Sequence, residues 1–177
     1  VELEGSATVN GSWEQLYNQA DGRYHDVTVA GSLSVGQNGR FVNHGTTSVG
    51  EGVSSSGLMA LLKPAIFKGS YKGDSAEMRL PIVVEGKNYN TGTIPLNIRE
   101  VASGSTTVNT VDASDWQTLK KPAFGDNYIL GKMGDGDKPD QSAFVLGNQD
   151  ALEDGYYLKR TNDVAGTDDN YMWQVAK

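Results

Sequence analysis

The chain of 177 residues contains no cysteine, which excludes disulfides, thiolate metal ligands and cysteine nucleophiles. Long apolar runs are also missing, because the longest covers only residues 58–62 and a membrane-spanning helix needs about 20 apolar residues. Positive charge is scarce: 15 lysines and arginines face 22 acids, and the net charge is −7. Such a chain repels phosphate backbones, so neither a membrane nor nucleic acid is an expected partner.

Catalytic and metal-binding signals are equally sparse. The only histidines, His25 and His44, stand far apart, and no hydrolase, zinc-protease or phosphate-loop motif is present. The acidic run at 135–140 offers carboxylates to a cation, but Pro139 falls where a calcium loop needs a ligand and no bidentate glutamate follows. We therefore expect no enzyme, no cofactor and no metal, and read residues 135–140 as a solvated turn.

What the sequence does contain is glycine, at 22 positions, between short apolar alternations that predict a mainly β protein. Val27, Val29, Leu33 and Val35 alternate with polar or small residues, which predicts a strand region over 24–35 with one buried face. Residues 78–84 and 93–101 are expected to form a β-hairpin with a long loop. Pro81 and Pro95 within them would mark edges or bulges.

Other segments give weaker patterns. Residues 57–67 are expected to be a strand, and the glycine- and serine-rich residues 45–57 a mobile surface loop. One or two short helices are expected, at 12–20, where Ser12 caps and Gln15 follows three residues later, and at 114–119. No internal repeat and no linker is evident, so residues 12–177 are expected to form a single domain.

Residues 1–11 alternate with unusual regularity. Small or apolar residues occupy the odd positions and polar residues the even ones, so that one face of a strand carries Val1, Leu3, Gly5, Ala7 and Val9. Glycine weakens a strand interior, so Gly5 suggests a shallow pocket or a close backbone approach. Two interpretations remain open: an edge strand within its own domain, or a strand donated to the open sheet of a neighbouring subunit.

The stretches 80–87, 93–98 and 27–33 resemble the strands and glycine-bearing turn of polyadhesive fimbrial subunits of the chaperone-usher pathway. The resemblance covers about the first 100 residues and rests on pattern. It implies an all-β fold, an incomplete immunoglobulin-like β-sandwich completed by donor-strand exchange. After residue 101 the chain carries no signature of this family, and residues 174–177 continue past the aromatic that usually ends its last strand.

The resemblance also implies a function: a secreted fimbrial subunit at the cell surface, acting as structural subunit or adhesin. Its partners would be other fimbrial subunits, a periplasmic chaperone and, for some members of the family, a host glycan. In that hypothesis Val1, Leu3, Gly5, Ala7 and Val9 enter successive pockets of the next subunit. The alternative is a free-standing carbohydrate- or receptor-binding β-sandwich module of a surface protein or a phage tail.

Either function directs attention to aromatic residues beside polar groups, because sugars stack on aromatic faces while amides, acids and bases bond their hydroxyls. Residues 150–160 contain all of these types within a short stretch. The candidate ligand-binding residues are Trp116, Asp154, Tyr156, Tyr157 and Lys159. Neighbouring strand residues face opposite ways, so one of the two tyrosines is expected to point into the core, as is Trp173.

Overall fold

In the computed structural model, which describes residues 1–15, 20, 22, 26–83, 94–132, 141–162 and 170–177, short strands dominate. The first ten are β1 Glu2–Leu3, β2 Ala7–Val9, β3 Ser12–Glu14, β4 Val27–Val29, β5 Leu33–Val35, β6 Arg40–Asn43, β7 Thr47–Val49, β8 Val53–Ser55, β9 Leu58–Leu61 and β10 Ala65–Phe67. The others are β11 Tyr71–Pro81, β12 Leu96–Ile98, β13 Ala102–Asp112, β14 Asp115–Leu119, β15 Asn127–Lys132, β16 Phe144–Leu146, β17 Tyr157–Asn162 and β18 Asn170–Ala176. Within these described residues, helical structure is confined to a 3₁₀ turn at Gln141–Ala143 and to α1, Gln149–Glu153.

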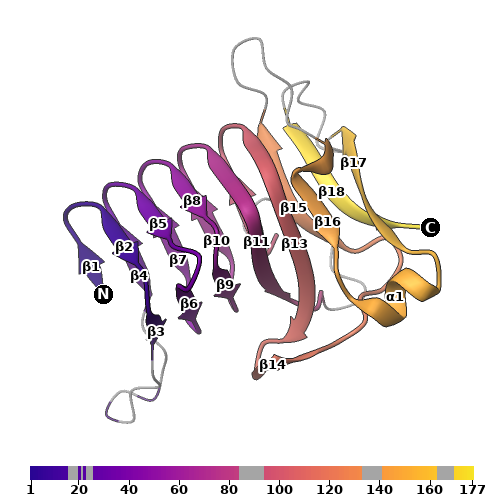
Figure 1. The fold of residues 1–177 in the computed structure, drawn as a ribbon, viewed down its shortest axis with the longest axis horizontal. Helices are drawn as coiled ribbons and strands as arrows, with labels where there is room; N and C mark the ends of the chain where they lie inside the picture. Colours follow the sequence, from indigo (N-terminus) through magenta and orange to yellow (C-terminus); the bar gives the residue numbers. More distant parts are fainter. Residues whose placement is uncertain (16–19, 21, 23–25, 84–93, 133–140, 163–169) are drawn as a thin grey trace.

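The pairing of these strands defines a parallel β-helix. Val27 of β4 pairs in parallel with Thr47 of β7, which pairs in parallel with Ala65 of β10. Neighbours in the ladder are thus about 20 residues apart in the chain, the length of one coil of a solenoid. Figure 1 shows the coils stacked from the N-terminus on the left toward the C-terminus on the right.

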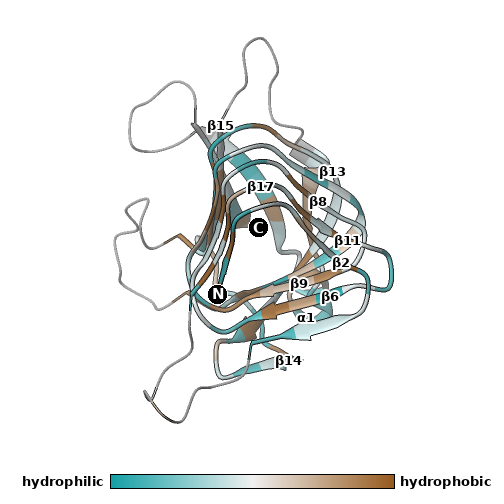
Figure 2. Cartoon of the chain, turned by 90° about the vertical axis from the view of Figure 1, so that its left-hand side faces the viewer, coloured by the Kyte–Doolittle hydropathy of each residue, from teal (hydrophilic) through white to brown (hydrophobic). Residues whose placement is uncertain are grey.

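The described strands of successive coils form three walls, and the end view in Figure 2 shows their roughly triangular cross-section. We call them walls A, B and C. Wall A contains β1, β4, β7, β10, β12 and β15; wall B contains β2, β5, β8 and the first parts of β11 and β13; wall C contains β3, β6, β9, the second parts of β11 and β13, and β16.

Alternation along every strand sends one set of side chains inward, where residues of successive coils stack in columns. In wall C one column starts with Trp13 and Phe41, whose rings stack with centroids 4.8 Å apart, and continues through Met59 and Met78 to Val108. Large side chains of this kind contribute about 1.5–3 kcal/mol each when buried. The columns are therefore the core of the β-helix.

Glycines occupy the corners between walls, where consecutive coils approach closely. A Cβ atom at Gly50 would collide with the carbonyl oxygen of Ala30 in the preceding coil, and one at Gly57 with that of Gly36. In β11 and β13 a bulge between Gly73 and Ala76 takes the place of a corner, with Gly104 at a φ of 83°. Much of the high glycine content thus reflects the stacking of corners.

The C-terminal end of the β-helix is closed by antiparallel strands. β15 pairs with β18, and β18 pairs with β17. Trp173 of β18 is fully buried, as expected from the sequence, and meets the ring of Phe144 edge to face at 5.1 Å. This aromatic contact joins the closing strands to the last coil.

The expected immunoglobulin-like sandwich is wrong. Sandwich strands pair mostly antiparallel, whereas the pairs between coils here are all parallel. The expected hairpin between 78–84 and 93–101 is also wrong, because β11 pairs with β8, β9 and β13 while β12 lies in wall A between β10 and β15. An alternating pattern specifies a half-buried strand without its partner, so it was compatible with either fold.

Several local expectations also need correction. Residues 45–57 are β7 and β8, with Val49 and Val53 buried, so they are no mobile loop. Residues 12–14 are β3, and residues 115–119 are β14, where helices were expected. The strand expected at 57–67 is confirmed but is divided into β9 and β10. The coils are themselves an internal repeat, although none was expected from the sequence. Residues 16–19 and 135–140 lie outside the described part of the chain.

Candidate binding surfaces

The N-terminal segment forms the first coil of its own β-helix. Glu2 and Leu3 pair with β4, and Ala7 to Val9 pair with β5. Of the two open interpretations, the structure shows the first: these residues form edge strands that are paired within their own chain. A Cβ at Gly5 would meet nothing within 4 Å, so neither a pocket nor a close approach explains this glycine. The five residues expected to enter a neighbouring subunit, Val1, Leu3, Gly5, Ala7 and Val9, thus belong to the first coil.

Trp116, a predicted ligand-binding residue, is packed against the outside of wall C. Only 7% of its surface is exposed, and it joins Val42, Ala60, Leu62 and Val111 in a small apolar cluster. The guanidinium carbons of Arg40 and Arg79 lie 5.5 and 5.6 Å from the ring centroid. The ring therefore has little surface left for a sugar.

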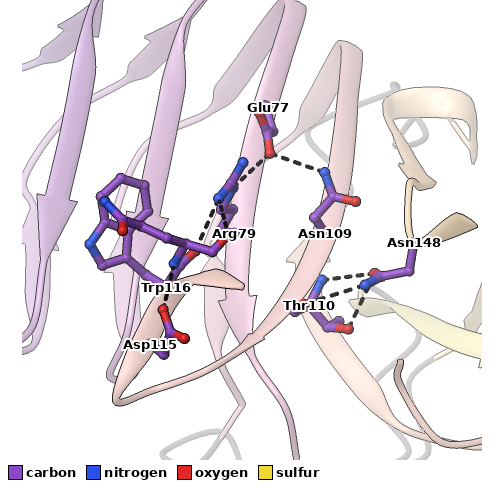
Figure 3. A network of polar contacts seen from close by, with 8 residues as sticks. Glu77, Arg79, Asn109, Thr110, Asp115, Trp116 and Asn148 are labelled. Atoms are coloured by element: carbon purple, nitrogen blue, oxygen red, sulfur yellow. Dashed lines mark hydrogen bonds and ion pairs between the residues drawn. The ribbon is translucent and has the colours of Figure 1, made fainter. Parts of the chain in front are cut away.

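Polar contacts hold β14, which carries Trp116, onto wall C (Figure 3). Arg79 Nη1 donates to the carbonyl oxygens of Trp116 and Gln117 at 3.1 and 3.3 Å, and its Nε donates to Glu77 Oε1 at 2.7 Å. Glu77 Oε1 also accepts a hydrogen bond from Asn109 Nδ2 at 3.0 Å. The network extends across three neighbouring strands and serves to position β14.

The turn before β14 and the segment after it are fixed by two further groups. The pKa of Asp112 lies well below its usual range, because its carboxylate accepts hydrogen bonds from the backbone N–H of Ser114 and from Lys120 Nζ, both at 3.0 Å. Buried Asn148 accepts from the backbone N–H of Thr110 at 2.8 Å and donates to the carbonyl oxygen of Lys120 at 3.0 Å. These contacts are structural.

The other four predicted ligand residues, Asp154, Tyr156, Tyr157 and Lys159, lie at the C-terminal end. Asp154 forms an ion pair with Lys121, whose ammonium lies 5.2 Å from the ring centroid of Tyr156. Tyr156 is half-buried against the core, and Tyr157 is 45% exposed, in line with the expected division of the two tyrosines. Lys159 is exposed on the same side of β17 as Tyr157. Trp116 is not part of this group.

A feature that the sequence analysis missed lies on wall B, where outward-facing polar residues of successive coils align. Thr8 of β2 is in register with Ser34 of β5, Ser34 with Ser54 of β8, and Ser54 with Lys72 of β11. Because neighbouring strands are about 4.8 Å apart, the four side chains form a regular row across the coils. The polar even positions were visible in the sequence, but aligning them requires the register.

This row lines an open groove of about 350 Å³. Its walls are formed by Thr8, Asn10, Ser34, Val35, Gly36, Ser54, Ser55, Ser56, Lys72 and Asp74. The hydroxyls of Ser34 and Ser54 hydrogen-bond to each other at 3.0 Å. The side chains of Lys72 and Asp74 form no hydrogen bond or ion pair with another described residue, so one positive and one negative group are available to a ligand. We call this feature the hydroxyl groove.

The chemistry of the hydroxyl groove is hydrogen bonding. A hydroxyl both donates and accepts, and it has no net charge. No histidine lines the groove: His44 lies outside it, with Nε2 2.9 Å from Glu14 Oε1 of wall C, and His25 is outside the described residues. Within the described ranges no group of three metal-ligating residues comes together, and no helix there is long and apolar enough to span a membrane.

A second groove, of about 510 Å³, lies at the C-terminal end and is mainly apolar. It is lined by Ser142, Phe144, Val145, Leu146, Leu152, Tyr157 and Leu158, from the 3₁₀ turn, β16, α1 and β17. A smaller apolar hollow of about 190 Å³ lies between the strands of the first coils, with Val1, Leu3 and Trp13 in its lining. The three surfaces differ in chemistry, and of these three the hydroxyl groove is the one lined mainly by hydroxyl, amide and charged residues.

No family model and no curated protein matches this chain. A function for it therefore has to be argued from its surfaces.

Proposed function

We propose that the protein is a carbohydrate-binding module that holds a linear, uncharged glycan in the hydroxyl groove. The observation that carries the proposal is the in-register row of Thr8, Ser34, Ser54 and Lys72 on four successive coils. A linear polysaccharide also presents hydroxyls at regular intervals along an extended chain. A β-helix can therefore repeat the same hydrogen-bonding group along the ligand, one coil after another.

Charge favours a neutral ligand. Lys72 and Asp74 lie two residues apart at one end of the groove, and their opposite charges cancel. The other polar liners are hydroxyls and the amide of Asn10. An anionic chain would meet Asp74 and the net negative charge of the whole protein, so uronic-acid or sulfated polymers are disfavoured.

The fimbrial hypothesis loses its structural basis, since strand donation as expected here required an incomplete immunoglobulin-like sandwich and the fold is a β-helix. The alternative was also expected to be a β-sandwich, and that part of it is wrong, but carbohydrate binding itself does not require that fold. It does not use Trp116, whose ring is covered, and draws its affinity from hydrogen bonds. Each such bond contributes about 0.5–1.5 kcal/mol net, so several coils must act together.

The test removes hydroxyls from the middle of the row. The double variant Ser34→Val, Ser54→Val keeps two strand-compatible side chains on wall B, and calorimetric titration with soluble linear glucans and mannans measures binding. Two lost hydrogen bonds, at about 0.5–1.5 kcal/mol each, predict that the dissociation constant rises at least about fivefold. The proposal also predicts that salt changes the affinity of the unmodified protein little, because the ligand is uncharged.

A matched control is available on wall A, where Thr28 and Ser48 are also in register between neighbouring coils. Thr28→Val, Ser48→Val removes the same number of hydroxyls and should leave binding within about twofold of the unmodified protein. Equal losses in the two double variants, or binding to no neutral glycan at millimolar concentration, would overturn the proposal.

A further inference from the structure

The apolar groove at the C-terminal end has the features of a protein-docking surface. Three of its lining residues, Val145, Leu152 and Tyr157, are 46%, 40% and 45% exposed. Large apolar side chains exposed together, unlike single ones, usually mark an interaction site. In Figure 1 the elements that supply them, β16, α1 and β17, lie together at the right-hand end of the molecule, away from the coils that form the hydroxyl groove.

Both strands of this surface end a sheet. β16 pairs with β13 alone, and β17 pairs with β18 alone, in the described part of the chain. Each therefore has one edge whose backbone groups are not part of a ladder. Such an edge accepts an extended segment by adding a strand, while pockets beside it take alternate side chains of that segment. The free edge therefore favours a partner with an extended backbone, and the apolar groove favours apolar side chains on that partner.

Charged residues on the elements that border the groove can set the direction in which a bound segment runs. On α1, Asp150 and Glu153 are exposed, and neither forms an ion pair with a described residue; Glu153 accepts only a hydrogen bond from Gln149 at 3.3 Å. Asp154 is already paired with Lys121. On β17, which also lines the groove, Lys159 is an exposed positive group two residues beyond Tyr157. Two elements that border the groove thus carry opposite charges, acids on α1 and Lys159 farther along β17, and we call these charged groups the rim.

We propose that this groove binds an extended segment of another protein, with alternating apolar residues, a lysine or arginine toward α1 and an acidic residue toward Lys159. The apolar side chains fill the groove beside Val145, Leu152 and Tyr157. The charged ends pair with the rim and fix the direction in which the segment runs. This surface is separate from the hydroxyl groove, so the inference does not depend on glycan binding.

A displayed library of random nine-residue peptides, selected on the intact protein, tests the proposal. The expected result is enrichment of alternating apolar sequences with a basic residue at one end and an acidic residue at the other. An enriched peptide should bind Val145→Lys at least tenfold more weakly, because the new charge lies in the apolar groove. Glu153→Lys should bind peptides with a basic end more weakly. It should bind more tightly the versions of these peptides in which the basic residue is replaced by glutamate.

Phe124→Lys is the matched control, since Phe124 is an exposed large apolar residue, at 66%, that does not line the groove. It should bind the enriched peptides as the unmodified protein does, and circular dichroism should show all three variants folded. The proposal is overturned if no sequence class is enriched, if Val145→Lys binds normally, or if reversing the peptide charges has no effect. It is also overturned if sedimentation shows that the groove is covered by a second copy of this chain, released by Val145→Lys.

Discussion

At the scale of single residues, the core tolerates polar groups where each finds a partner. Thr47 faces inward from β7, and its hydroxyl accepts a hydrogen bond from buried Asn43 Nδ2 at 2.7 Å. Asn43 also accepts from the backbone N–H of Gly45 at 3.1 Å, which fixes the corner after β6. Tyr71 and Thr106 form a similar buried pair at 2.7 Å between β11 and β13. Unpaired, each group would cost about 1–3 kcal/mol.

Tyr71 makes stability depend on pH in the alkaline range. Burial raises the pKa of Tyr71 from 10.0 to about 12, so the folded state favours the neutral phenol. Its contribution is complete below pH 10 and is lost as the pH rises through 12; at pH 11 the loss is about 1.4 kcal/mol. We expect Tyr71→Phe, which keeps the ring, to lose less stability between pH 9 and 11 than the unmodified protein in urea titrations. Identical losses would contradict the assignment to Tyr71.

At the scale of elements, β14 is an attachment to the β-helix and contributes no coil. It pairs antiparallel with the end of β13 and lies across wall C, where Trp116 covers the outward-facing Val42 and Ala60. This cover explains why two outward positions in wall C are apolar. The outward positions of wall B, by contrast, are polar and border a groove. The outward-facing residues of a wall are therefore apolar where another element packs over them and polar where none does.

Arg79 should control whether β14 stays attached. Arg79→Met removes both hydrogen bonds to the backbone of β14 and the contact with the Trp116 ring. We expect amides of β14 to exchange with deuterium at least about tenfold faster, while core amides of β7 and β10 change little, because the opening is local. Arg99→Met, at an exposed arginine of a corner, is the control and should leave β14 protected. Uniformly faster exchange would show that Arg79 supports the whole β-helix instead.

At the scale of the whole molecule, the β-helix is a stack in which most strands touch only the coils before and after them. Its stability is then approximately the sum of the coils and the interfaces between neighbours. The two proposed surfaces use different parts of this stack. The hydroxyl groove needs several consecutive coils, whereas the apolar groove needs only the C-terminal closure.

Deleting one full coil tests this organisation. Removing residues 47–64 joins residue 46 to Ala65 and places β10 next to β4 in the register that β7 had with β4. We expect a folded protein with reduced thermal stability and weaker glycan binding, since Ser54 is lost from the row. Removing residues 47–55 alone disrupts the coil and should leave the protein unfolded by circular dichroism. Equal behaviour of the two deletions would argue against independent coils.

The sequence alone was sufficient for the β-rich composition, for the inward-facing Val27, Val29, Leu33 and Val35, and for Trp173 in the core, because period-two alternation and residue size act locally. The sequence also contains a repeat. The pattern of two apolar pairs in 27–35 recurs, with fewer apolar residues, at 47–55 and 65–73.

Which strands become neighbours was decided only in the tertiary structure. Alternation is the same in parallel and antiparallel strands, and a glycine at a solenoid corner resembles a glycine in a hairpin. The register between coils aligned Ser34 with Ser54, and packing across wall C buried Trp116. Both depend on residues brought together from distant parts of the chain, which no local pattern encodes.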